Sequence, residues 1–591
     1  MLSERVRRIC CFEMVTHPRK RFRTLAALVF LLPSVACSPG CVETSRSQQT
    51  PVAGSAITQP LSLAGQAYLR SIIESGRLND LRWPEFGSYR ADIATFYQSY
   101  GYALPWIRDM RPTTQARAVI EALSRADEKG LSPDDYEGPK WTDRIARLQS
   151  NASRADEAGA VRFDVALTVS LMRYVSDLHT GRIDPHVFGI DVNIAERKCD
   201  LPKFLSEQIL PAADVRAALL RVEPSYPGYE RTIRALETYR RLVKEKTGQP
   251  FPDTNRAIAP GQSYSGAPRL RQFLQLVGDL PSNAPVPSEQ TTYDPALADA
   301  VKSFQERHGL TPDGRIGPKT LEELNVPLEN RVKQIELTLE RWRWLPAQYG
   351  EAPIVVNIPG FMLRAYDDAF HVAVTMKVVV GRAYDRETPI FMSRLQSVVF
   401  RPYWDIPVSI ARKEIVPAIE RDPEYLAKQD MEIVNGRGEV VATDTVSSDV
   451  LHQIRTGRLS VRQRPGPNNA LGLIKFQFPN EYSVYMHDTP ARLLFARSQR
   501  DFSHGCIRLE KPAELAAWAL RDNPGWDPDR ILAAMNGEET LEVRLVHPIP
   551  VLVVYGTTIV LEDGIVRFYD DIYGQDAKLE EALRNDYPYP H

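Results

Sequence analysis

The sequence YSVYMHDTPARLLFARSQRDFSHGCIRLEKP, residues 482–512, combines the alternation of a β-strand with a cluster of reactive side chains. Successive side chains of a strand point to opposite faces, so Val484 and Met486 are expected on one face. Tyr485 and His487 then share the other face and project together into whatever covers it. We therefore expect a β-rich region with chemistry on one side of a sheet.

A thiol follows this strand in the run SHGCIR, residues 503–508, which begins sixteen residues after His487. The thiol of Cys506 needs a base or cationic surroundings to become a good nucleophile near neutral pH. His487, with the histidine and arginine of the run, can supply both. Gly505 lets the backbone approach a substrate with no Cβ in the way, and the N–H groups around Gly505 and Cys506 can hold a developing oxyanion.

The residues alone leave other interpretations of Cys506 open. It can instead be a buried free thiol, or a disulfide partner of Cys199 in an oxidising compartment. Zinc binding by Cys506, His487 and His504 is a third interpretation, but the sequence lacks the usual histidine pair at i,i+4 or a CxxC pattern.

A period of two extends through much of the C-terminal half, and bounded runs of this kind are typical of strands. The expected strands are 353–358, 361–366, 370–380, 395–400, 481–487, 541–546, 551–555 and 565–569. Residues 402–463 interrupt this rhythm with a charged helical stretch at 409–428 and an Asn435-Gly436 turn. A long insertion between strands is often a lid over a binding site, and the alternative is a solvated excursion.

The N-terminal half is helical, with apolar residues at helical spacing such as Ile93, Phe96 and Tyr97. The run FDVALTVSLMRYVSDL, residues 163–178, is apolar on most sides, which predicts a helix buried inside a bundle. Nothing in this region arranges a nucleophile with a base, so we expect a scaffold.

A compact helical unit at residues 293–325 follows the Pro/Ser-rich stretch 281–290. An apolar stripe marks its first helix, a glycine ends that helix, and an Asp-Gly pair predicts the turn to a second one. The unit resembles the peptidoglycan-binding module of many cell-wall enzymes through HGL (308–310) and DGRIG (313–317) with Thr320. The alternative is a generic helical hairpin that uses glycine for its turns.

The N-terminus has the pattern of a secretory signal, with basic residues at 19–23, a short apolar run at 25–32 and small residues before Cys37. The apolar run is too short to span a bilayer comfortably. A buried helix start is the alternative, although the basic cluster would flank its entry. Cleavage after Ala36 is the ordinary outcome, while Ala36-Cys37 also resembles a lipoprotein site with an atypical Ser34. We expect export, and leave lipidation of Cys37 open.

Length and charge bound the class of protein. The 591 residues exceed what one hydrophobic core usually supports, so several domains are expected. The net charge of −2 excludes a globally basic nucleic-acid binder. Six cysteines are too few for a disulfide scaffold.

His487, followed after this gap by Ser-His-Gly-Cys at 503–506 and by Arg508, resembles the signature of the YkuD-type L,D-transpeptidases. Residue types, order and spacing all agree with that family. The likeness extends to its large multidomain periplasmic branch, typified by YcbB. Further similar segments lie at 96–106, 178–185, 401–407, 464–472 and 571–574.

The resemblance implies that Cys506 is the nucleophile and that His487 is the base that takes its proton. The third member of the site would be a backbone carbonyl beside the base, here that of Asp488. Tyr485 and Trp404 resemble residues that line the donor pocket.

The same family pattern implies that Ser503, His504 and Gly505 shape the loop and its oxyanion site. Arg508 would brace this loop or help to hold substrate. The insertion at 408–463 corresponds to the branch's capping subdomain, which favours the lid over the solvated excursion. No cofactor and no metal are expected, and no phosphate-binding glycine loop is evident.

The implied activity is 3→3 cross-linking of peptidoglycan. The Cys506 thiolate would attack the carbonyl of the third residue of a tetrapeptide stem and expel the terminal D-Ala. A side-chain amine of a neighbouring stem would then take the acyl group. The same acyl-enzyme would serve an L,D-carboxypeptidase, D-amino-acid exchange or lipoprotein anchoring with another acceptor. A non-catalytic wall-binding scaffold is the alternative from another class. The family also implies inactivation by carbapenems.

The expected partners are peptidoglycan stem peptides and glycan strands, with other cell-wall synthesis enzymes as candidates, no nucleic acid, and a membrane tether at Cys37 left open. The expected location is the periplasm of a Gram-negative-type bacterium. The expected fold is multidomain α+β, in these parts: signal peptide 1–36, flexible tether 37–60, mainly helical scaffold 61–280, small helical peptidoglycan-binding module 281–326, connecting helix 327–346, β-rich catalytic domain 347–540 with its capping insertion at 408–463, and C-terminal strands and tail 541–591.

Overall fold

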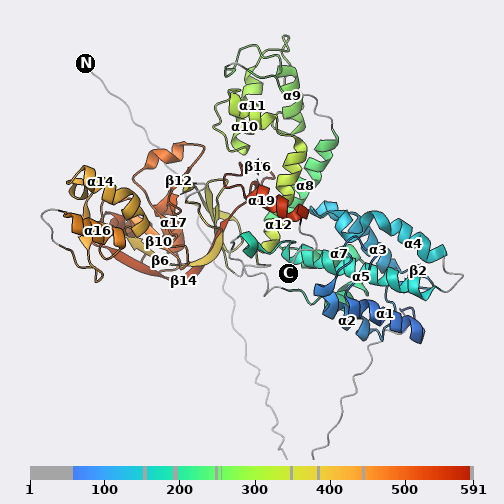
Figure 1. Ribbon diagram of the computed structural model, residues 1–591. Coiled ribbons are helices and arrows are strands. Elements are labelled where there is room, and N and C mark those ends of the chain that lie inside the picture. The colour runs from blue at the N-terminus through green and yellow to red at the C-terminus, as the bar shows by residue number, and fades with distance from the viewer. Residues whose placement is uncertain are drawn as a thin grey trace, which may run out of the picture. The chain divides into compact units, whose positions relative to one another are not determined.

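The computed structural model describes residues 58–585, with gaps at 151–155, 189, 191–197, 246–249, 255, 347–350, 383–385 and 442–445. The expected signal peptide and nearly all of the expected tether, including Cys37, lie outside the described residues. The described part confirms the predicted multidomain α+β organisation (Figure 1). No helix within it is long and apolar enough to cross a membrane.

The N-terminal helices pack around the long helix α5 (Glu157–Thr180), which is buried along nearly its whole length, as its composition predicts. Aromatic hydroxyls bond its two buried aspartates, since Tyr97 donates to Asp164 at 2.7 Å and Tyr136 donates to Asp177 at 2.6 Å. The neighbouring helices are α1 (Leu63–Ser75), α2 (Arg90–Ser99), α3 (Thr114–Ser124), α4 (Trp141–Ser150), α6 (Leu201–Phe204) and α7 (Val215–Leu219).

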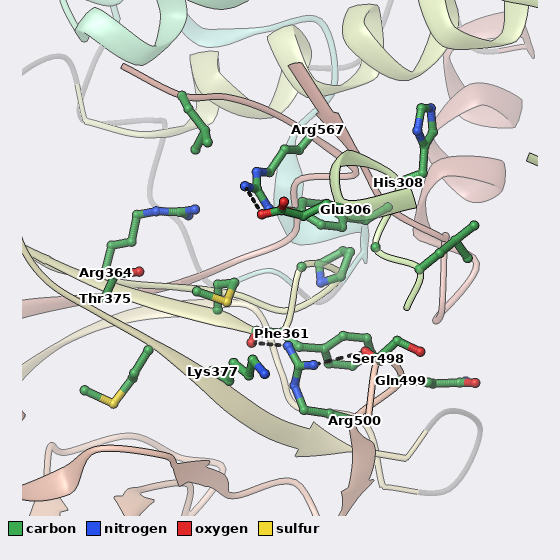
Figure 2. A pocket seen from close by; sticks show the side chains of 18 of the residues that line it. Glu306, His308, Phe361, Arg364, Thr375, Lys377, Ser498, Gln499, Arg500 and Arg567 are labelled. Carbon is green, nitrogen blue, oxygen red and sulfur yellow. Dashed lines mark hydrogen bonds and ion pairs between the residues drawn. The ribbon is translucent and has the colours of Figure 1, made fainter. Parts of the chain in front are cut away.

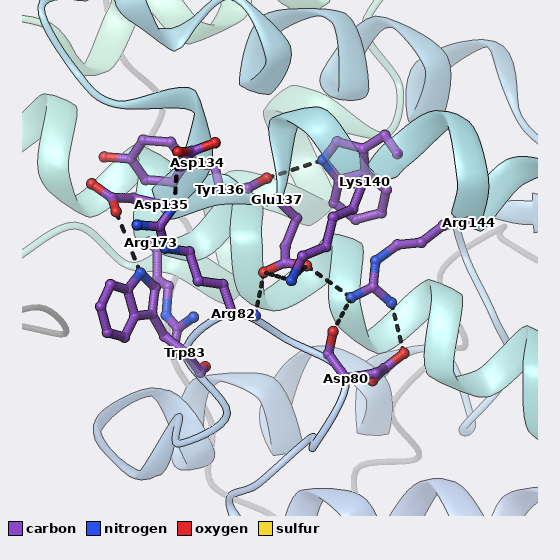
Figure 3. Close-up of polar contacts among 11 residues, drawn as sticks. Asp80, Arg82, Trp83, Asp134, Asp135, Tyr136, Glu137, Lys140, Arg144 and Arg173 are labelled. Carbon is purple, nitrogen blue, oxygen red and sulfur yellow. Dashed lines mark hydrogen bonds and ion pairs between the residues drawn. The ribbon is translucent and has the colours of Figure 1, made fainter.

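A polar network joins the loop before α2 to the segment around the start of α4 (Figure 3). Glu137 is buried, and it accepts hydrogen bonds from the backbone N–H of Arg82 and from the guanidinium of Arg144 at 2.9 Å. Arg144 also donates to the carboxylate of Asp80 at 2.7 Å. These contacts hold the two segments together, so the network has a structural role in this helical region.

The next helices belong to two further cores. They are α8 (Pro227–Lys244), α9 (Ala267–Leu276), α10 (Pro295–Arg307), α11 (Pro318–Leu324) and α12 (Leu328–Trp344). Helices α9, α10 and α11 share one small core. The side chain of Gln305 fixes the turn between the last two, because it donates to Asp313 at 2.9 Å and to Thr320 at 3.0 Å. Since α9 belongs to the same core, this unit begins before residue 281, the boundary expected from the Pro/Ser-rich stretch.

Among the described residues, nine strands form one sheet in the order β12-β5-β13-β11-β10-β6-β14-β3-β4. An additional pairing of β4 with β5 closes the sheet around a core that includes Leu395, Ile507 and Val551. The strands are β3 (Ile354–Asn357), β4 (Met362–Tyr366), β5 (Val372–Gly381), β6 (Phe391–Phe400), β10 (Ile474–Gln477), β11 (Met486–His487), β12 (Asp501–Ser503), β13 (Ile507–Leu509) and β14 (Leu541–Val554), and helices α17 (Pro512–Ala519) and α18 (Pro528–Asn536) add side chains to this core.

Two strands predicted near the C-terminus are one strand, β14. It pairs in parallel with β3 and antiparallel with β6, and the pairing is irregular between Arg544 and Ile549, where the alternation breaks. The sheet therefore extends past residue 540, the boundary expected for the catalytic domain. Strands β15 (Thr558–Val560) and β16 (Val566–Phe568) and helix α19 (Gln575–Asn585) follow it.

The strand predicted at 481–487 is shorter than expected. Ser483 has a positive φ of 56°, and the side chain of Asn480 accepts from the backbone N–H of Val484 at 2.9 Å. A side chain that bonds its own neighbouring backbone competes with the sheet. Only Met486 and His487 therefore join the ladder.

The insertion folds as a subdomain with a hydrophobic core of its own, and strands β7, β9 and β8 form its small sheet. A solvated excursion would not have such a core. The helix predicted at 409–428 breaks after Arg421, because Asp422 precedes Pro423 and takes an extended conformation. The elements are β7 (Trp404–Asp405), α13 (Val408–Ile410), α14 (Val416–Arg421), α15 (Tyr425–Lys428), β8 (Met431–Val434), α16 (Ser448–Thr456) and β9 (Ser460–Gln463).

Replacing Leu395 by Ala should lower the free energy of unfolding by about 2–5 kcal/mol, because this side chain of β6 is fully buried. Leu493 is 87% exposed, and its replacement by Ala is the matched control, with an expected change below about 0.5 kcal/mol. Urea unfolding followed by tryptophan fluorescence measures both variants. Equal shifts would contradict this placement of the core.

Candidate active site

Three neighbouring strands carry the reactive side chains. β11 lies between β10 and β13, with His487 opposite Lys475 on one side and opposite Arg508 on the other. Tyr485 shares the face of His487, as the alternation predicts, and the two ring centroids are 5.7 Å apart. Cys506 directly precedes β13, and its thiol lies near Tyr485, Lys475 and Arg508 of this face.

His487 is held as a neutral base. Its Nδ1 lies 2.5 Å from the carbonyl oxygen of Asp488. A carbonyl can only accept, so Nδ1 carries the proton and Nε2 keeps its lone pair. Burial lowers the pKa of His487 to about 3; the positive charge of Arg508 acts in the same direction, and the Asp488 hydrogen bond opposes it. The imidazole is therefore neutral near pH 7, as a group that accepts a proton must be.

The carboxylate of Asp488 anchors this carbonyl. Its Oδ2 accepts from the backbone N–H of Leu473 at 2.9 Å, and its Oδ1 accepts from the guanidinium of Arg492 at 2.6 Å. At Gly472, where φ is 63°, a Cβ would lie 2.4 Å from the same carboxylate. Both oxygens are used inside the protein, so Asp488 acts through the position of its backbone.

Burial raises the pKa of the Cys506 thiol above its ordinary value, while hydrogen bonds to Tyr485 and the charges of Lys475 and Arg508 act in the opposite direction. The thiol is therefore mainly protonated at neutral pH and needs a base beside it. Cys199 is a separate free thiol packed against the helical core. This removes the disulfide interpretation of Cys506.

The SHGC loop, residues 503–506, leaves the backbone N–H groups of His504 and Cys506 without an acceptor among the described residues. Gly505 has a φ of 112°, which side chains with a Cβ rarely allow, and its N–H donates to Ser503 Oγ at 3.1 Å. Ser503 Oγ donates in turn to the carbonyl oxygen of Cys506 at 2.6 Å. The backbone N–H of Cys506 has no acceptor among the described residues. Sequence reasoning offered both N–H groups for an oxyanion, whereas that of Gly505 is already engaged.

His504 contacts the capping subdomain. Its Nε2 lies 2.7 Å from Oε1 of Glu414, which also pairs with Arg386 at 3.0 Å. Burial raises the pKa of Glu414, but the hydrogen bonds from His504 and Arg386 outweigh burial, and the pKa is lowered. His504 thus links the SHGC loop to the cap, and its Nε2 is occupied by this contact.

Lys475 is a site residue that sequence reasoning missed. Its Nζ lies 4.2 Å from the ring centroid of Tyr485. Burial lowers the pKa of Lys475, and the neighbouring Cys506 acts to raise it. Burial raises the pKa of the Tyr485 hydroxyl, and a hydrogen bond with Trp404 of β7 opposes that shift. The alternation in IKFQ, residues 474–477, could have found Lys475, but this strand was not among those predicted.

Cavities border the sheet at several places. One, of about 660 Å³, is lined by Lys475 and Tyr485 among others, and both of these residues act on the Cys506 thiol. A larger one, of about 830 Å³, is shown in Figure 2. Its lining includes Arg500, whose guanidinium donates to the carbonyl oxygen of Phe361 at 3.0 Å, but it includes neither member of the cysteine–histidine pair. The lining of the smaller cavity does not include Cys506 or His487 either, so this cavity is connected to the reactive groups only through Lys475 and Tyr485.

Comparison with protein families matches separate parts of the chain. Residues 91–236 match a scaffold domain, residues 267–324 match a peptidoglycan binding domain, and residues 352–551 match the YkuD L,D-transpeptidase catalytic domain. The chain contains an L,D-transpeptidase catalytic domain. Both resemblances predicted from the motifs are confirmed at the level of these domains. The transpeptidase match includes the SHGC loop and the strands that carry the base and the lysine.

A curated protein of Haemophilus influenzae named "Putative L,D-transpeptidase" is 31% identical over 256 residues, which is 43% of this chain and 50% of that protein. The chain thus matches about half the length of this relative. A crystal structure of an L,D-transpeptidase (Yku) from Stackebrandtia nassauensis is similar at 12% sequence identity. The match includes 97% of that chain and 52% of this one. Its TM-score is 0.19, so this likeness carries no weight for the transpeptidase domain.

Replacing Lys475 by Met should slow alkylation of Cys506 by iodoacetamide at pH 8 by roughly tenfold, because the lost charge lets the pKa of the thiol rise further. Lys475→Arg keeps the charge and is the control. The alkylation rate of the Cys506 peptide, followed by mass spectrometry from pH 6 to pH 11, gives both profiles. Superimposable profiles for the Met and Arg variants would show that Lys475 does not act on the thiol.

Proposed function

We propose that this protein is an L,D-transpeptidase that forms 3→3 cross-links in peptidoglycan through a thioester on Cys506. The observation that carries the proposal is that this thiol lies near Tyr485, Lys475 and Arg508, on the sheet face of His487. His487 is a neutral imidazole whose Nε2 keeps its lone pair. A nucleophile and a base oriented by a third group are the requirements of covalent acyl transfer.

The chemistry follows from these groups. Nε2 of His487 takes the thiol proton as Sγ of Cys506 attacks the carbonyl carbon of the third stem residue. The backbone N–H of Cys506 stabilises the oxyanion of the tetrahedral intermediate. The intermediate expels the amine of D-Ala, to which His487 returns the proton. A side-chain amine of a second stem then attacks the thioester, His487 removes its proton, and the thiol is restored.

The other domains support peptidoglycan as the substrate. The unit at 267–324 matches a peptidoglycan binding domain, which is the module that would hold glycan strands and stem peptides near the thiol. Peptidoglycan lies outside the cytoplasm, so the proposal includes export to the periplasm by the N-terminal signal. The exchange of one peptide bond for another through a thioester needs no nucleotide there.

Water is the competing acceptor, and it would turn the same acyl-enzyme into an L,D-carboxypeptidase. The contact between Glu414 of the cap and His504 of the SHGC loop favours cross-linking, since a cap held against the loop excludes water from the thioester. D-amino-acid exchange and lipoprotein anchoring would use the same intermediate. A pure wall-binding scaffold would need neither Cys506 nor its base.

Replacing Cys506 by Ala should abolish product formation, since no thioester can form. Purified protein is incubated with disaccharide-tetrapeptide, and products are identified by mass spectrometry. The Cys199→Ala variant removes the other described thiol and is the control. We expect the wild-type protein and this control to give a dimer that has lost one D-Ala. We also expect both to form a carbapenem adduct on Cys506. Product from the Cys506→Ala variant would contradict the proposal, as would a wild-type protein that forms neither product nor adduct.

Replacing Glu414 by Gln should raise the ratio of tripeptide to dimer by roughly two- to fivefold, because the cap loses its charged contact with His504 and Arg386. Glu420→Gln is the matched control within the cap, since Glu420 pairs at 2.6 Å with Arg455 of the cap itself. The same product assay measures the ratio. An unchanged ratio in the Glu414 variant would mean that this contact does not control access of water.

A further inference from the structure

A buried chain of hydrogen bonds runs from the C-terminal segment to the SHGC loop. The hydroxyl of Tyr573 donates to the carbonyl oxygen of Gly381 at 2.6 Å and accepts from the backbone N–H of Thr388 at 3.2 Å. Thr388 Oγ1 donates to the carbonyl oxygen of Gly505 at 2.8 Å and accepts from Gly381 N at 2.8 Å. Thr388 is 1% exposed and Tyr573 is 4% exposed, so water does not compete for these bonds.

The last bond of this chain fixes the direction of the oxyanion donor. The carbonyl of Gly505 and the N–H of Cys506 belong to one peptide unit. That unit is planar and trans, so its C=O and N–H point in opposite directions. When Thr388 Oγ1 holds the carbonyl from one side, the N–H is aimed at the other. This N–H has no acceptor among the described residues, so it is available to an oxyanion.

Tyr573 is itself held in place from the sheet. Its backbone N–H donates to the hydroxyl of Tyr555 at 2.9 Å, and that hydroxyl donates to Asp571 Oδ1 at 2.6 Å. Asp571 Oδ2 accepts from the backbone N–H of Asp576 at 3.0 Å at the start of α19. All of these residues lie beyond residue 551, where the match to the transpeptidase family ends.

The geometry assigns Thr388 and Tyr573 as positioning residues for the Cys506 peptide N–H, an inference that rests on the proposed acyl transfer. Thr388 aims the donor through the Gly505 carbonyl, and Tyr573 holds Thr388 through its backbone N–H. Neither touches substrate. The nucleophile and the base lie within residues 352–551, which match the transpeptidase family. The C-terminal segment adds the contacts that orient the oxyanion donor.

The test separates oxyanion stabilisation from thiol reactivity. Acylation of Cys506 by a tetrapeptide or a carbapenem passes through an oxyanion, whereas alkylation by iodoacetamide displaces iodide and forms none. Thr388→Val keeps the shape of the side chain and removes its hydrogen bonds. We expect its acylation rate constant to fall by roughly ten- to a hundredfold with little change in KM. Alkylation should stay within about twofold of wild type, because the base and the charges around the thiol are untouched.

Three further variants complete the design. Thr388→Ser restores the hydroxyl and should recover most of the acylation rate. Tyr573→Phe should lower the acylation rate of Cys506 without lowering its alkylation rate. This variant tests the inference independently if Thr388→Val does not fold. Tyr569→Phe is the control, since this buried tyrosine lies in the same segment and its ring packs against Gly360.

Wild-type acylation rates in both Thr388→Val and Tyr573→Phe would overturn the inference and leave the proposed function intact. An equal fall in acylation and alkylation, with a lower unfolding midpoint, would assign the chain a structural role only and would overturn it as well. A wild-type protein that is alkylated on Cys506 but never acylated would contradict the proposed function, and this inference with it.

Discussion

The register of β11 against β13 is the constraint on which the rest of the site depends. These strands pair in parallel with His487 opposite Arg508, which places Cys506 and His487 on one face. Side chains alternate along a strand, so a slip of one residue would send either the thiol or the imidazole into the core. The apolar residues between them, Met486 and Ile507, are fully buried and oppose such a slip.

Burial then sets the protonation states that the chemistry needs. Burial lowers the pKa of His487 and raises the pKa of Cys506, so the resting groups are a neutral imidazole and a protonated thiol. The carbonyl of Asp488 selects the tautomer, and the positive charges of Lys475 and Arg508 favour the thiolate once it forms. Around this pair, Thr388 aims a backbone donor and Glu414 holds the cap to the loop. Each of these contacts acts on the SHGC loop, which directly precedes β13 and is therefore positioned by the pairing of β11 with β13.

Local sequence could predict the parts of this site that lie close together in the chain. The alternation around Tyr485 and His487 was sufficient to predict that these two side chains share a face. The buried helix α5 and the turn at Asp313 were predicted for the same reason, since each depends on residues within one or two turns of chain. For the helix, the spacing of apolar residues along the sequence indicates which side chains are buried.

The remainder depends on contacts between distant segments, which periodicity does not encode. Lys475 comes from a strand too short to be recognised, and Glu414 reaches His504 across 90 positions. Thr388 and Gly505 are 117 positions apart, and nothing in the sequence near either one indicates the other. The hydrogen bond from the Gly505 N–H to Ser503 is local in the chain. It depends on the positive φ of Gly505, which a glycine allows but which the sequence does not determine.

The most direct test of the central claim is ¹⁵N NMR of histidine-labelled protein, with the His487 signal identified by its loss in the His487→Gln variant. The chain has 10 histidines, so this assignment is practical. The account predicts a neutral imidazole with its proton on Nδ1 that stays unchanged from pH 8 to pH 5. The account would be contradicted if the His487 signal titrated with a midpoint near the ordinary histidine pKa of about 6.5. It would also be contradicted if the signal showed the proton on Nε2.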